Sequence, residues 1–508
     1  MREIGISNYN LFTPPKNNIQ KKVFMKITNK SLLKDQAYID GTWVDADDAA
    51  TFAVFNPATG EKLATLPDLS AAETKRAIAA ADKAWDAWKS KSGKQRAVIL
   101  RQFFDLMMDN QEDLAQILTA ECGKPLAEAR GEIAYGAAFI EWFAEEAKRA
   151  YGDLIPATVN DRRIVVIKQA IGVCAAITPW NFPNAMITRK IGPALAAGCP
   201  VILKPAAETP LSALAIAELA NQAGIPAGIF SVITSSDGAK IGAELTANPS
   251  VRKISFTGST AVGKILMRQS AATVKKLSLE LGGNAPFIVF DDADLDAAVA
   301  GAMASKYRNS GQTCVCVNRF LVQEGVYDAF IDKLTAAVKK LKVGNGADEG
   351  VTQGPLINEA GMEKVAAHVA DALDKGGRVI IGGKPHALGR SFYEPTIIAD
   401  VTPEMKVAKE ETFGPLAPVF RFKTEQEAIA MANDTEFGLA SYFYTRDAGR
   451  VWRVGEALEY GIVGINEGII STEVAPFGGV KESGLGREGS HYGLDDYMEI
   501  KYMCMGGI

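Results

Sequence analysis

The chain alternates short apolar runs with amphipathic segments between residues 171 and 271, and this alternation restricts the possible folds more than any other sequence feature. The apolar runs, which we predict to be strands, lie at 171–177, 201–203, 229–233 and 253–256. The predicted helices cover 184–197, 211–223, 237–246 and 261–271. Strands of about five residues that alternate with helices are typical of a parallel, doubly wound sheet. Such a sheet commonly binds a nucleotide at the carboxyl ends of its strands.

A second alternation follows the segment Leu-Gly-Gly-Asn-Ala-Pro at 281–286, which we interpret as a crossing between two domains. Its predicted strands lie at 287–290, 320–322, 379–381, 418–422, 441–444 and 462–466. Its predicted helices cover 294–306, 326–341, 424–433 and 447–457. The sequence therefore predicts a second α/β domain. Short strands over 40–67 and helices over 70–150 precede the first alternation.

Three segments are predicted to lie outside these two cores. The β-branched run at 164–168 indicates a protruding hairpin or an edge strand. The tail at 497–504 alternates like a strand that pairs outside its own core, and an oligomer interface is one use for it. Residues 1–24 are polar and have neither an apolar signal core nor an Arg/Ser-rich amphipathic pattern, so we predict a disordered extension over 1–35.

The composition excludes several classes of protein. Among 508 residues, 47% are hydrophobic and 23% charged, which is typical of globular proteins, and the net charge of −5 gives no basic surface for nucleic acid or anionic lipid. No apolar stretch reaches the roughly 18 residues of a membrane helix. The six cysteines are scattered, which favours a reducing, cytoplasmic location. The three histidines form no ligand pattern, so we expect no metal site.

Three residues are candidates for covalent chemistry. Cys314 lies in the loop Gly-Gln-Thr-Cys-Val-Cys, where a substrate could reach a nucleophile, although an inert cysteine in a tight turn is the alternative. Glu280 ends an apolar run, where burial would raise its pKa towards that of a general base; the alternative is a strand-end glutamate that faces solvent. Asn181 lies between two prolines just after a strand, where a rigid amide donor suits an oxyanion hole.

Two further segments are candidates for a nucleotide site. The segment 256–263, Phe-Thr-Gly-Ser-Thr-Ala-Val-Gly, joins a strand to a helix, so backbone N–H groups near Gly258 could face a pyrophosphate. It is not the dinucleotide fingerprint, and a helix capped by Ser259 or Thr260 explains it almost as well. Lys204 ends a strand and could donate to ribose hydroxyls or phosphate; a surface lysine before a turn is the alternative.

Taken together and in this order, these segments resemble the aldehyde dehydrogenase superfamily over residues 36–508. The segments 279–284 and 311–314 look like its two active-site signatures, and 121–125, 186–190, 308–316 and 501–504 look like its succinate-semialdehyde dehydrogenase branch. The resemblance implies an α/β fold with a Rossmann-type cofactor domain (36–150 and 170–281) and an α/β catalytic domain (282–480). It also implies a small β oligomerisation arm (151–169 and 490–508) and a homo-oligomer, either a dimer or a tetramer.

The resemblance further implies the oxidation of succinate semialdehyde to succinate, as in γ-aminobutyrate degradation. In this family Cys314 would attack the aldehyde, while the Asn181 amide and the Cys314 backbone N–H would hold the oxygen of the thiohemiacetal. Glu280 would deprotonate the water that hydrolyses the thioester. Glutarate semialdehyde is an alternative substrate. A cysteine hydrolase or acyltransferase, or a structural protein, are alternatives of other classes.

Cofactor contacts are carried over from the family. Glu411 would bind the nicotinamide ribose, with Phe413 in the same segment, and Lys204 would contact the adenosine ribose. Trp180 and Ser259 would flank the diphosphate. Members that favour NAD often have a glutamate at the position of Ala207, so its absence here favours NADP, with NAD as the alternative.

The branch also implies how a distal carboxylate is recognised. Arg189, Arg308 and Ser471 match its carboxylate-binding residues, and guanidinium groups suit a carboxylate because they bind it in bidentate fashion. Cys316 lies two residues from Cys314, and such a pair can close into a strained, readily reduced disulfide. An ordinary small loop residue is the alternative for Cys316.

Overall fold

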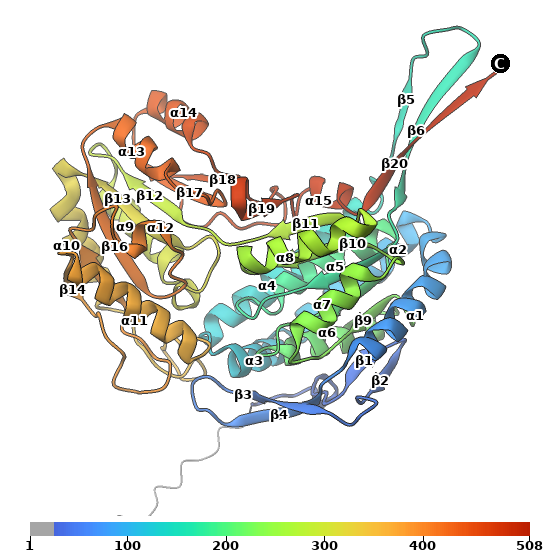
Figure 1. Cartoon of the computed structure of the whole chain (residues 1–508), viewed down its shortest axis with the longest axis horizontal. Coiled ribbons are helices and arrows are strands. Elements are labelled where there is room, and N and C mark those ends of the chain that lie inside the picture. Colours follow the sequence, from blue (N-terminus) through green and yellow to red (C-terminus); the bar gives the residue numbers. More distant parts are fainter. Residues whose placement is uncertain (1–24) are drawn as a thin grey trace, which may run out of the picture.

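A computed structural model describes residues 25–508, which form two large sheets, their covering helices and a projecting arm (Figure 1). The predicted disorder of residues 1–24 lies outside the described residues. For 25–35 the prediction of disorder is wrong, because Ile27 and Leu32 are buried and the backbone N–H groups of Thr28 and Asn29 donate to Asp113. A 3-10 turn, η1 (Lys30–Leu32), lies within this segment.

The first sheet has eight strands in the order β19-β11-β10-β7-β8-β9-β1-β2. Its five central strands are parallel: β7 (Val173–Ile177), β8 (Val201–Lys204), β9 (Phe230–Val232), β10 (Val251–Thr257) and β11 (Lys276–Glu280). The antiparallel edges are β1 (Ala37–Ile39), β2 (Thr42–Val44) and β19 (Gly484–Leu485). After β9 the chain returns to the other side of β7 and forms β10. The strand order therefore reverses between β7 and β10, and ligands bind at such a switch point in open α/β sheets.

Helices cover both faces of this sheet, because alternate residues of each buried strand point to opposite faces. On one face, Cys174 and Ala176 of β7 pack with α2 (Gly93–Asp109), α3 (Gln111–Cys122), α4 (Leu126–Glu146), α5 (Ala185–Ala197) and α6 (Pro210–Gln222). On the other, Val173 and Ala175 pack with α1 (Ala71–Lys89), α7 (Gly238–Ala247) and α8 (Thr260–Ser270), which the turn η2 (Ala271–Thr273) follows.

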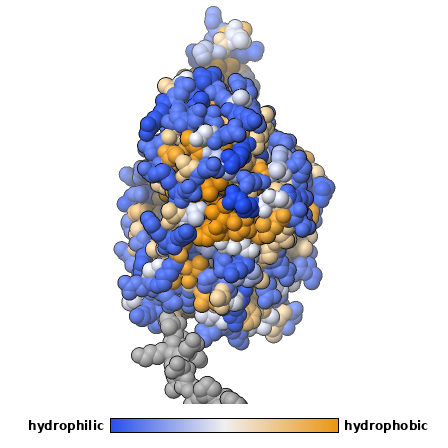
Figure 2. Space-filling view, turned by 90° about the vertical axis from the view of Figure 1, so that its left-hand side faces the viewer, coloured by the Kyte–Doolittle hydropathy of each residue, from blue (hydrophilic) through white to orange (hydrophobic). Residues whose placement is uncertain are grey.

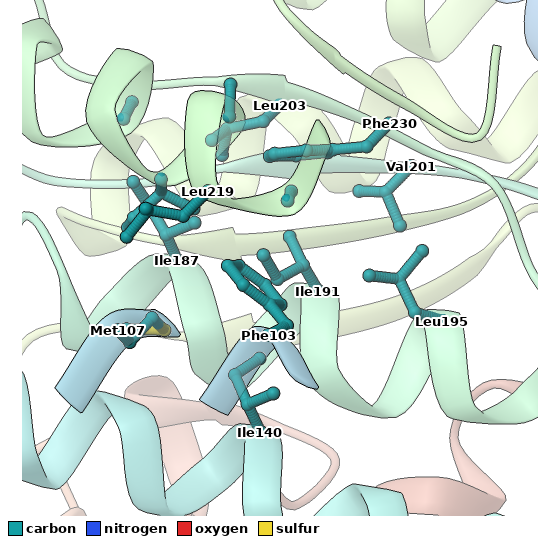
Figure 3. Packing of buried hydrophobic residues seen from close by; sticks show 14 of the residues in the cluster. Phe103, Met107, Ile140, Ile187, Ile191, Leu195, Val201, Leu203, Leu219 and Phe230 are labelled. Atoms are coloured by element: carbon teal, nitrogen blue, oxygen red, sulfur yellow. The ribbon is translucent and has the colours of Figure 1, made fainter. Parts of the chain in front are cut away.

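Helix α5 is buried along its whole length, and this fixes the loop that precedes it. Its residues Ile187, Ile191 and Leu195 lie between the sheet and the helices α2 and α4 (Figure 3). Phe103 of α2 and Ile140 of α4 meet them from the outer layer. The loop between β7 and α5, which contains Trp180 and Asn181, is therefore anchored at both ends.

The second sheet has seven strands in the order β14-β15-β16-β13-β12-β17-β18, parallel except for β14. The strands are β12 (Ala285–Val289), β13 (Val317–Gln323), β14 (Arg378–Ile381), β15 (Thr396–Ala399), β16 (Leu416–Phe422), β17 (Ala440–Tyr444) and β18 (Ile462–Ile465). Its helices are α9 (Leu295–Lys306), α10 (Tyr327–Val338), α11 (Glu359–Asp374), α12 (Lys406–Lys409), α13 (Glu425–Asn433) and α14 (Ala448–Ala457). The 3-10 turns are η3 (Arg308–Gly311), η4 (Glu324–Val326) and η5 (Lys481–Ser483).

The arm is a three-stranded sheet of β5 (Asp153–Ile155), β6 (Arg162–Ala170) and β20 (Met498–Gly506), which projects from the body (Figure 1). The C-terminal strand β20 pairs antiparallel with β6 from Met498 to Gly506. The short helix α15 (Tyr492–Asp495), which lies inside the range predicted for the arm, packs instead against α5. A separate hairpin of β3 (Thr51–Phe55) and β4 (Lys62–Pro67) completes the strands. The predicted fold class is confirmed.

Two surface properties complete the description. The face at the left of Figure 1 is largely hydrophilic, with an apolar area near its middle (Figure 2). Among residues 25–508, no helix is both long and apolar enough to cross a membrane.

Candidate active site

The predicted site residues gather where the two sheets meet. Asn181, Lys204, Gly258 and Glu280 follow or end the parallel strands β7, β8, β10 and β11, at their carboxyl ends. We call each large sheet with its covering helices a unit. Cys314 comes from the second unit, which is built on the seven-stranded sheet, and lies between η3 and β13. The chain crosses between the sheets at 281–284, beside the Cys314 loop: a Cβ atom on Gly283 would lie 2.6 Å from the carbonyl oxygen of Cys314. Only glycine permits this approach.

Cys314 is partly buried, with two arginines and two carboxylates in its surroundings. Burial raises the pKa of its thiol to about 12, with Glu280 and Glu411 acting in the same direction and Arg189 and Arg308 opposing. The thiol therefore needs a base before it can act as a nucleophile. Its backbone N–H donates to no acceptor in the part of the chain that the structure describes. This N–H is free to bind an oxyanion.

The side-chain amide of Asn181 is buried and directed at the Cys314 loop. Its Nδ2 donates to the carbonyl of Gln312 over 3.1 Å, while its Oδ1 has no hydrogen-bond partner among residues 25–508. The carbonyl of Asn181 accepts hydrogen bonds from Lys124 Nζ and Asn309 Nδ2, each at 2.9 Å. The structure thus brings the predicted amide donor to the predicted nucleophile's loop.

Glu280 is only 3% exposed, so the alternative of a solvent-facing glutamate is wrong. Its Oε2 has no hydrogen-bond partner among the described residues. Burial raises its pKa well above the usual value, as does the nearby carboxylate of Glu488, while Arg189 and Lys190 act against this shift. The charge of Glu280 acts on the Cys314 thiol, and an unpartnered carboxyl group with a raised pKa is suited to general base catalysis.

Glu488, which the sequence analysis did not identify, pairs with Arg189 and Lys190, and its charge acts on Glu280. Its Oε2 lies 2.8 Å from Nε of Arg189 and its Oε1 lies 2.5 Å from Nζ of Lys190. Although burial acts to raise the pKa of Glu488, Lys190 and Arg189 lower it below the usual value. Glu488 lies in a Gly-Arg-Glu-Gly loop, and the neighbouring sequence does not predict its role, because its partner Lys190 is 298 residues away.

The three residues predicted to bind a carboxylate lie in two places. Arg189 is buried in α5 with its guanidinium carbon 3.9 Å from the Phe477 ring centre, and its Nη2 has no hydrogen-bond partner in the described chain. Arg308 and Ser471 line one small pocket together with Tyr442. Arg308 forms no ion pair with any carboxylate of residues 25–508, so its charge is available to a ligand.

Trp180, which is predicted to flank the diphosphate, lies beside Phe413, which belongs to the segment predicted to bind the nicotinamide ribose. The rings of Trp180 and Phe413 meet edge to face at 5.5 Å, and Phe413 has a left-handed backbone with φ of 58°. Oε1 of Glu411 accepts the N–H of Gly283 over 3.0 Å, and burial raises the pKa of Glu411 to about 7. The chain between the two sheets is thereby fixed to the segment that carries Glu411.

At the switch point, Gly258 and Ser259 immediately precede α8. The N–H of Gly258 donates to the carbonyl of Glu280 over 3.0 Å, and Ser259 caps the helix by accepting from the N–H of Val262. The capping interpretation is therefore confirmed. It does not exclude anion binding, because the N-terminus of an eleven-residue helix still carries unpaired N–H groups.

The predicted adenosine end is more open. Lys204 is buried, which lowers the pKa of its amine, yet the amine makes no hydrogen bond or ion pair within residues 25–508. Such an amine fits a ligand with ribose hydroxyls or a phosphate. Ala207 is partly exposed. Asp68 accepts hydrogen bonds from Oγ of Ser235 and the N–H of Ser236, both at 2.9 Å.

Cys316 is buried with a partner other than Cys314. Its Sγ lies 3.4 Å from Nζ of Lys306, and both side chains are inaccessible to solvent. All six cysteines are free thiols. A disulfide between Cys314 and Cys316 stays a prediction.

Comparison with known proteins agrees with this arrangement. The model of the aldehyde dehydrogenase family matches residues 43–503. A glutarate-semialdehyde dehydrogenase of Pseudomonas aeruginosa is 66% identical over 484 residues, covering 95% of this chain and 100% of the relative. The NADP(+) succinate-semialdehyde dehydrogenase GabD of Escherichia coli is 65% identical over 482 residues, with 95% and 100% coverage. The crystal structure of succinate-semialdehyde dehydrogenase from Burkholderia pseudomallei superimposes with a TM-score of 0.94 at 67% identity, covering 95% of this chain and 100% of that one.

Proposed function

The chain belongs to the aldehyde dehydrogenase family, and from this premise we propose that it oxidises succinate semialdehyde to succinate with NADP. The observation that carries the choice of substrate is the pocket shared by Arg308 and Ser471. Arg308 forms no ion pair among residues 25–508 and lines this pocket with Ser471 and with Val315, the residue after Cys314, and such a guanidinium favours an aldehyde whose other end is a carboxylate. Arg189, with its unpartnered Nη2, adds a second buried cation.

The first half of the proposed reaction is covalent. Cys314 attacks the aldehyde carbon as the thiolate, after its thiol proton passes to solvent water. The developing oxyanion binds the Asn181 amide and the Cys314 N–H. When bound, NADP supplies the acceptor for the hydride that the thiohemiacetal carbon loses.

The second half is hydrolytic. Loss of the hydride leaves an acyl group joined to Cys314 as a thioester. Glu280 takes a proton from water, the resulting hydroxide adds to the thioester carbon, and the C–S bond breaks to release the carboxylic acid and the thiol group. The same oxyanion donors serve both halves, because both pass through a tetrahedral centre.

The residues present fit a dinucleotide. The free amine of Lys204 and the N-terminus of α8 provide donors for ribose and phosphate oxygens, and Glu411 provides an acceptor for ribose hydroxyls. The absence of a carboxylate at Ala207 supports NADP over NAD. Ser235 and Ser236 already donate hydrogen bonds to Asp68, so a 2′-phosphate would have to displace this carboxylate as their acceptor. The negative charge of Asp68 therefore disfavours NADP.

A cysteine hydrolase is a weaker interpretation of the same thiol. His368 is engaged by Thr412 and Glu410, each at 3.1 Å, and neither His386 nor His491 bonds to Cys314. A hydrolase needs no dinucleotide, so it would give Gly258 and Ser259 at the switch point no ligand to bind.

We also propose that the arm joins copies of this chain. Its strands expose large apolar side chains, among them Leu154, Ile500, Tyr502 and Met505, with between 56% and 74% of each accessible. Burial of such a surface favours association. Light scattering of the full chain and of a variant with Ile500→Asp and Tyr502→Asp tests this, with a smaller particle expected for the variant and an unchanged mass contradicting the proposal.

The substrate proposal is tested by kcat/KM for succinate semialdehyde, glutarate semialdehyde and butanal, with NADP and with NAD, followed at 340 nm. We expect the carboxylated aldehydes to exceed butanal by about tenfold or more, with succinate semialdehyde and NADP highest. A higher value for glutarate semialdehyde would instead assign that substrate. Equal values for butanal would contradict carboxylate recognition.

A further inference from the structure

We propose that Asn309 is a positioning residue that sets the oxyanion hole by joining the Asn181 loop to the Cys314 loop. The proposal rests on the oxyanion role proposed for Asn181 above. An oxyanion hole made of one side-chain amide and one backbone N–H works only if the two donors keep a fixed separation. Here the two donors belong to units with different sheets, so some group must hold the loops together.

The amide of Asn309 provides that connection. Its Nδ2 donates to the carbonyl of Asn181 over 2.9 Å and to the carbonyl of Gln312 over 3.2 Å. The amide of Asn181 donates to the same Gln312 carbonyl over 3.1 Å. Asn181, Asn309 and Gln312 are at most 5% exposed, so water competes little for these hydrogen bonds. Gln312 precedes Cys314 by two residues.

Asn309 is itself held in place. Its backbone is left-handed, with φ of 50° and ψ of 39°, a conformation that asparagine tolerates better than most residues. Its N–H donates to Oε2 of Glu128 over 2.7 Å, and its carbonyl accepts from the N–H of Gln312 over 3.0 Å. A strained residue that several contacts fix in this way is typical of functional sites.

Lys124 and Glu132 hold the Asn181 loop from within its own unit. Lys124 donates to the carbonyl of Asn181 and forms a fully buried ion pair with Glu132. Oε1 of Glu132 accepts from the N–H groups of Asn184 and Ala185, at the start of α5. These contacts attach the loop to its own unit. Loss of Asn309 therefore leaves the loop folded, but only the hydrogen bond from the Asn181 amide to the Gln312 carbonyl then joins the two loops. The distance between the amide of Asn181 and the N–H of Cys314 is then less firmly fixed.

The test measures hydride transfer in a single turnover, with NADP and excess enzyme. Asn309→Gly keeps the left-handed backbone and removes the amide, while Asn309→Asp keeps the shape and replaces the donor with an acceptor. We expect both to slow hydride transfer by about 10- to 100-fold, with the Kd for NADP unchanged. Two variants are used so that failure of one to fold leaves the other.

Ser310→Gly is the matched control. Ser310 has the same left-handed backbone, with φ of 55°, and its Oγ donates to the carbonyl of Gly354 over 2.9 Å and forms no hydrogen bond with the Asn181 loop among the described residues. We expect this variant to lower Tm but to keep the rate of hydride transfer. A rate as low as that of Asn309→Gly would show that the turn, rather than the Asn309 amide, matters, and would overturn the proposal.

A double-mutant cycle separates positioning from other roles. If Asn309 acts through Asn181, the variant with Asn181→Ala and Asn309→Gly transfers hydride no more slowly than Asn181→Ala alone. Additive losses would overturn the proposal, as would a wild-type rate for both Asn309 variants. A wild-type rate for Asn181→Ala would instead refute the proposed oxyanion role, which is a distinct outcome.

Discussion

The two ends of the proposed cofactor and substrate site differ in how they are built. At the reacting end, Asn181 and Glu280 of the first unit meet Cys314 of the second in surroundings that shift the pKa values of the thiol and the carboxyl group upward. At the adenosine end, Lys204 and Ala207 belong to the first unit alone, and Ser236 and Glu208 are exposed to solvent. Asn181 and Glu280 are buried at the first end, whereas Ser236 and Glu208 face water at the second.

This difference predicts how strongly each end responds to substitution. Electrostatic interactions are stronger where water is excluded and are screened at the surface. Changes at the reacting end should therefore alter rates by orders of magnitude, while changes at the adenosine end should alter the ratio between two cofactors by a few fold.

The largest effect is expected for Cys314→Ala, which removes the nucleophile. Turnover of succinate semialdehyde, measured at 340 nm, should fall by about a thousandfold or more. The Kd for NADP, measured by calorimetric titration, should stay the same because no cofactor contact is removed. Turnover near the wild-type rate would contradict covalent catalysis.

Glu280→Gln should separate the two halves of the reaction. We expect a burst of one equivalent of reduced cofactor and then a steady state slower by about 100-fold or more, because thioester hydrolysis has lost its base. In the wild type, hydrolysis should speed up as pH rises through the raised pKa of Glu280, since only the ionised carboxylate accepts a proton. The rate of the variant should lack this rise. Unimpaired steady-state turnover would exclude Glu280 as the base.

Arg308→Ala should have an intermediate effect, confined to carboxylated substrates. The KM for succinate semialdehyde should rise by about ten- to a hundredfold, as expected for the loss of a charge-assisted hydrogen bond. The KM for butanal should not change. Arg421→Ala, at an exposed ion pair with Asp328, is the control and should leave both values unchanged. Equal losses on both aldehydes in Arg308→Ala would make this arginine structural.

The smallest effect is expected at the adenosine end, for Ala207→Glu. A new carboxylate there repels a 2′-phosphate, so the ratio of kcat/KM for NADP to that for NAD should fall, by about two- to fivefold at a site this exposed. Glu208→Gln, which removes a carboxylate one residue later, serves as the comparison. An unchanged ratio in Ala207→Glu would place cofactor selectivity at Ser235, Ser236 and Asp68.

The sequence predicted the strands that carry the site because buried parallel strands are continuous apolar runs between helices. The predicted strand at 253–256 lies within β10, and the predicted helix at 184–197 differs from α5 by one residue. Helix α11 and strand β15 were missed. Helix α11 buries Val365, His368, Val369 and Ala372 at the i, i+3, i+4 and i+7 spacing of an amphipathic helix, so the sequence did contain the pattern that predicts it.

The residues that support the site could not be predicted in the same way. Lys124 and Asn309 lie within segments that resemble the family, yet nothing local connects them with Asn181, which is 57 residues from one and 128 from the other. Glu488 reaches Lys190 only because the chain returns from the second sheet to the first. Sequence motifs predict the side chains that react. The side chains that position them come from distant segments and can be identified only in the folded structure.

The central claim is that Cys314 carries an acyl group that Glu280 helps to remove, and intact-protein mass spectrometry tests it most directly. Glu280→Gln is mixed with succinate semialdehyde and NADP and quenched in acid. The account predicts protein with one added succinyl group, located on Cys314 by peptide mapping and absent when Cys314→Ala is introduced as well. Unmodified Glu280→Gln protein that has nevertheless released reduced cofactor and succinate would contradict it.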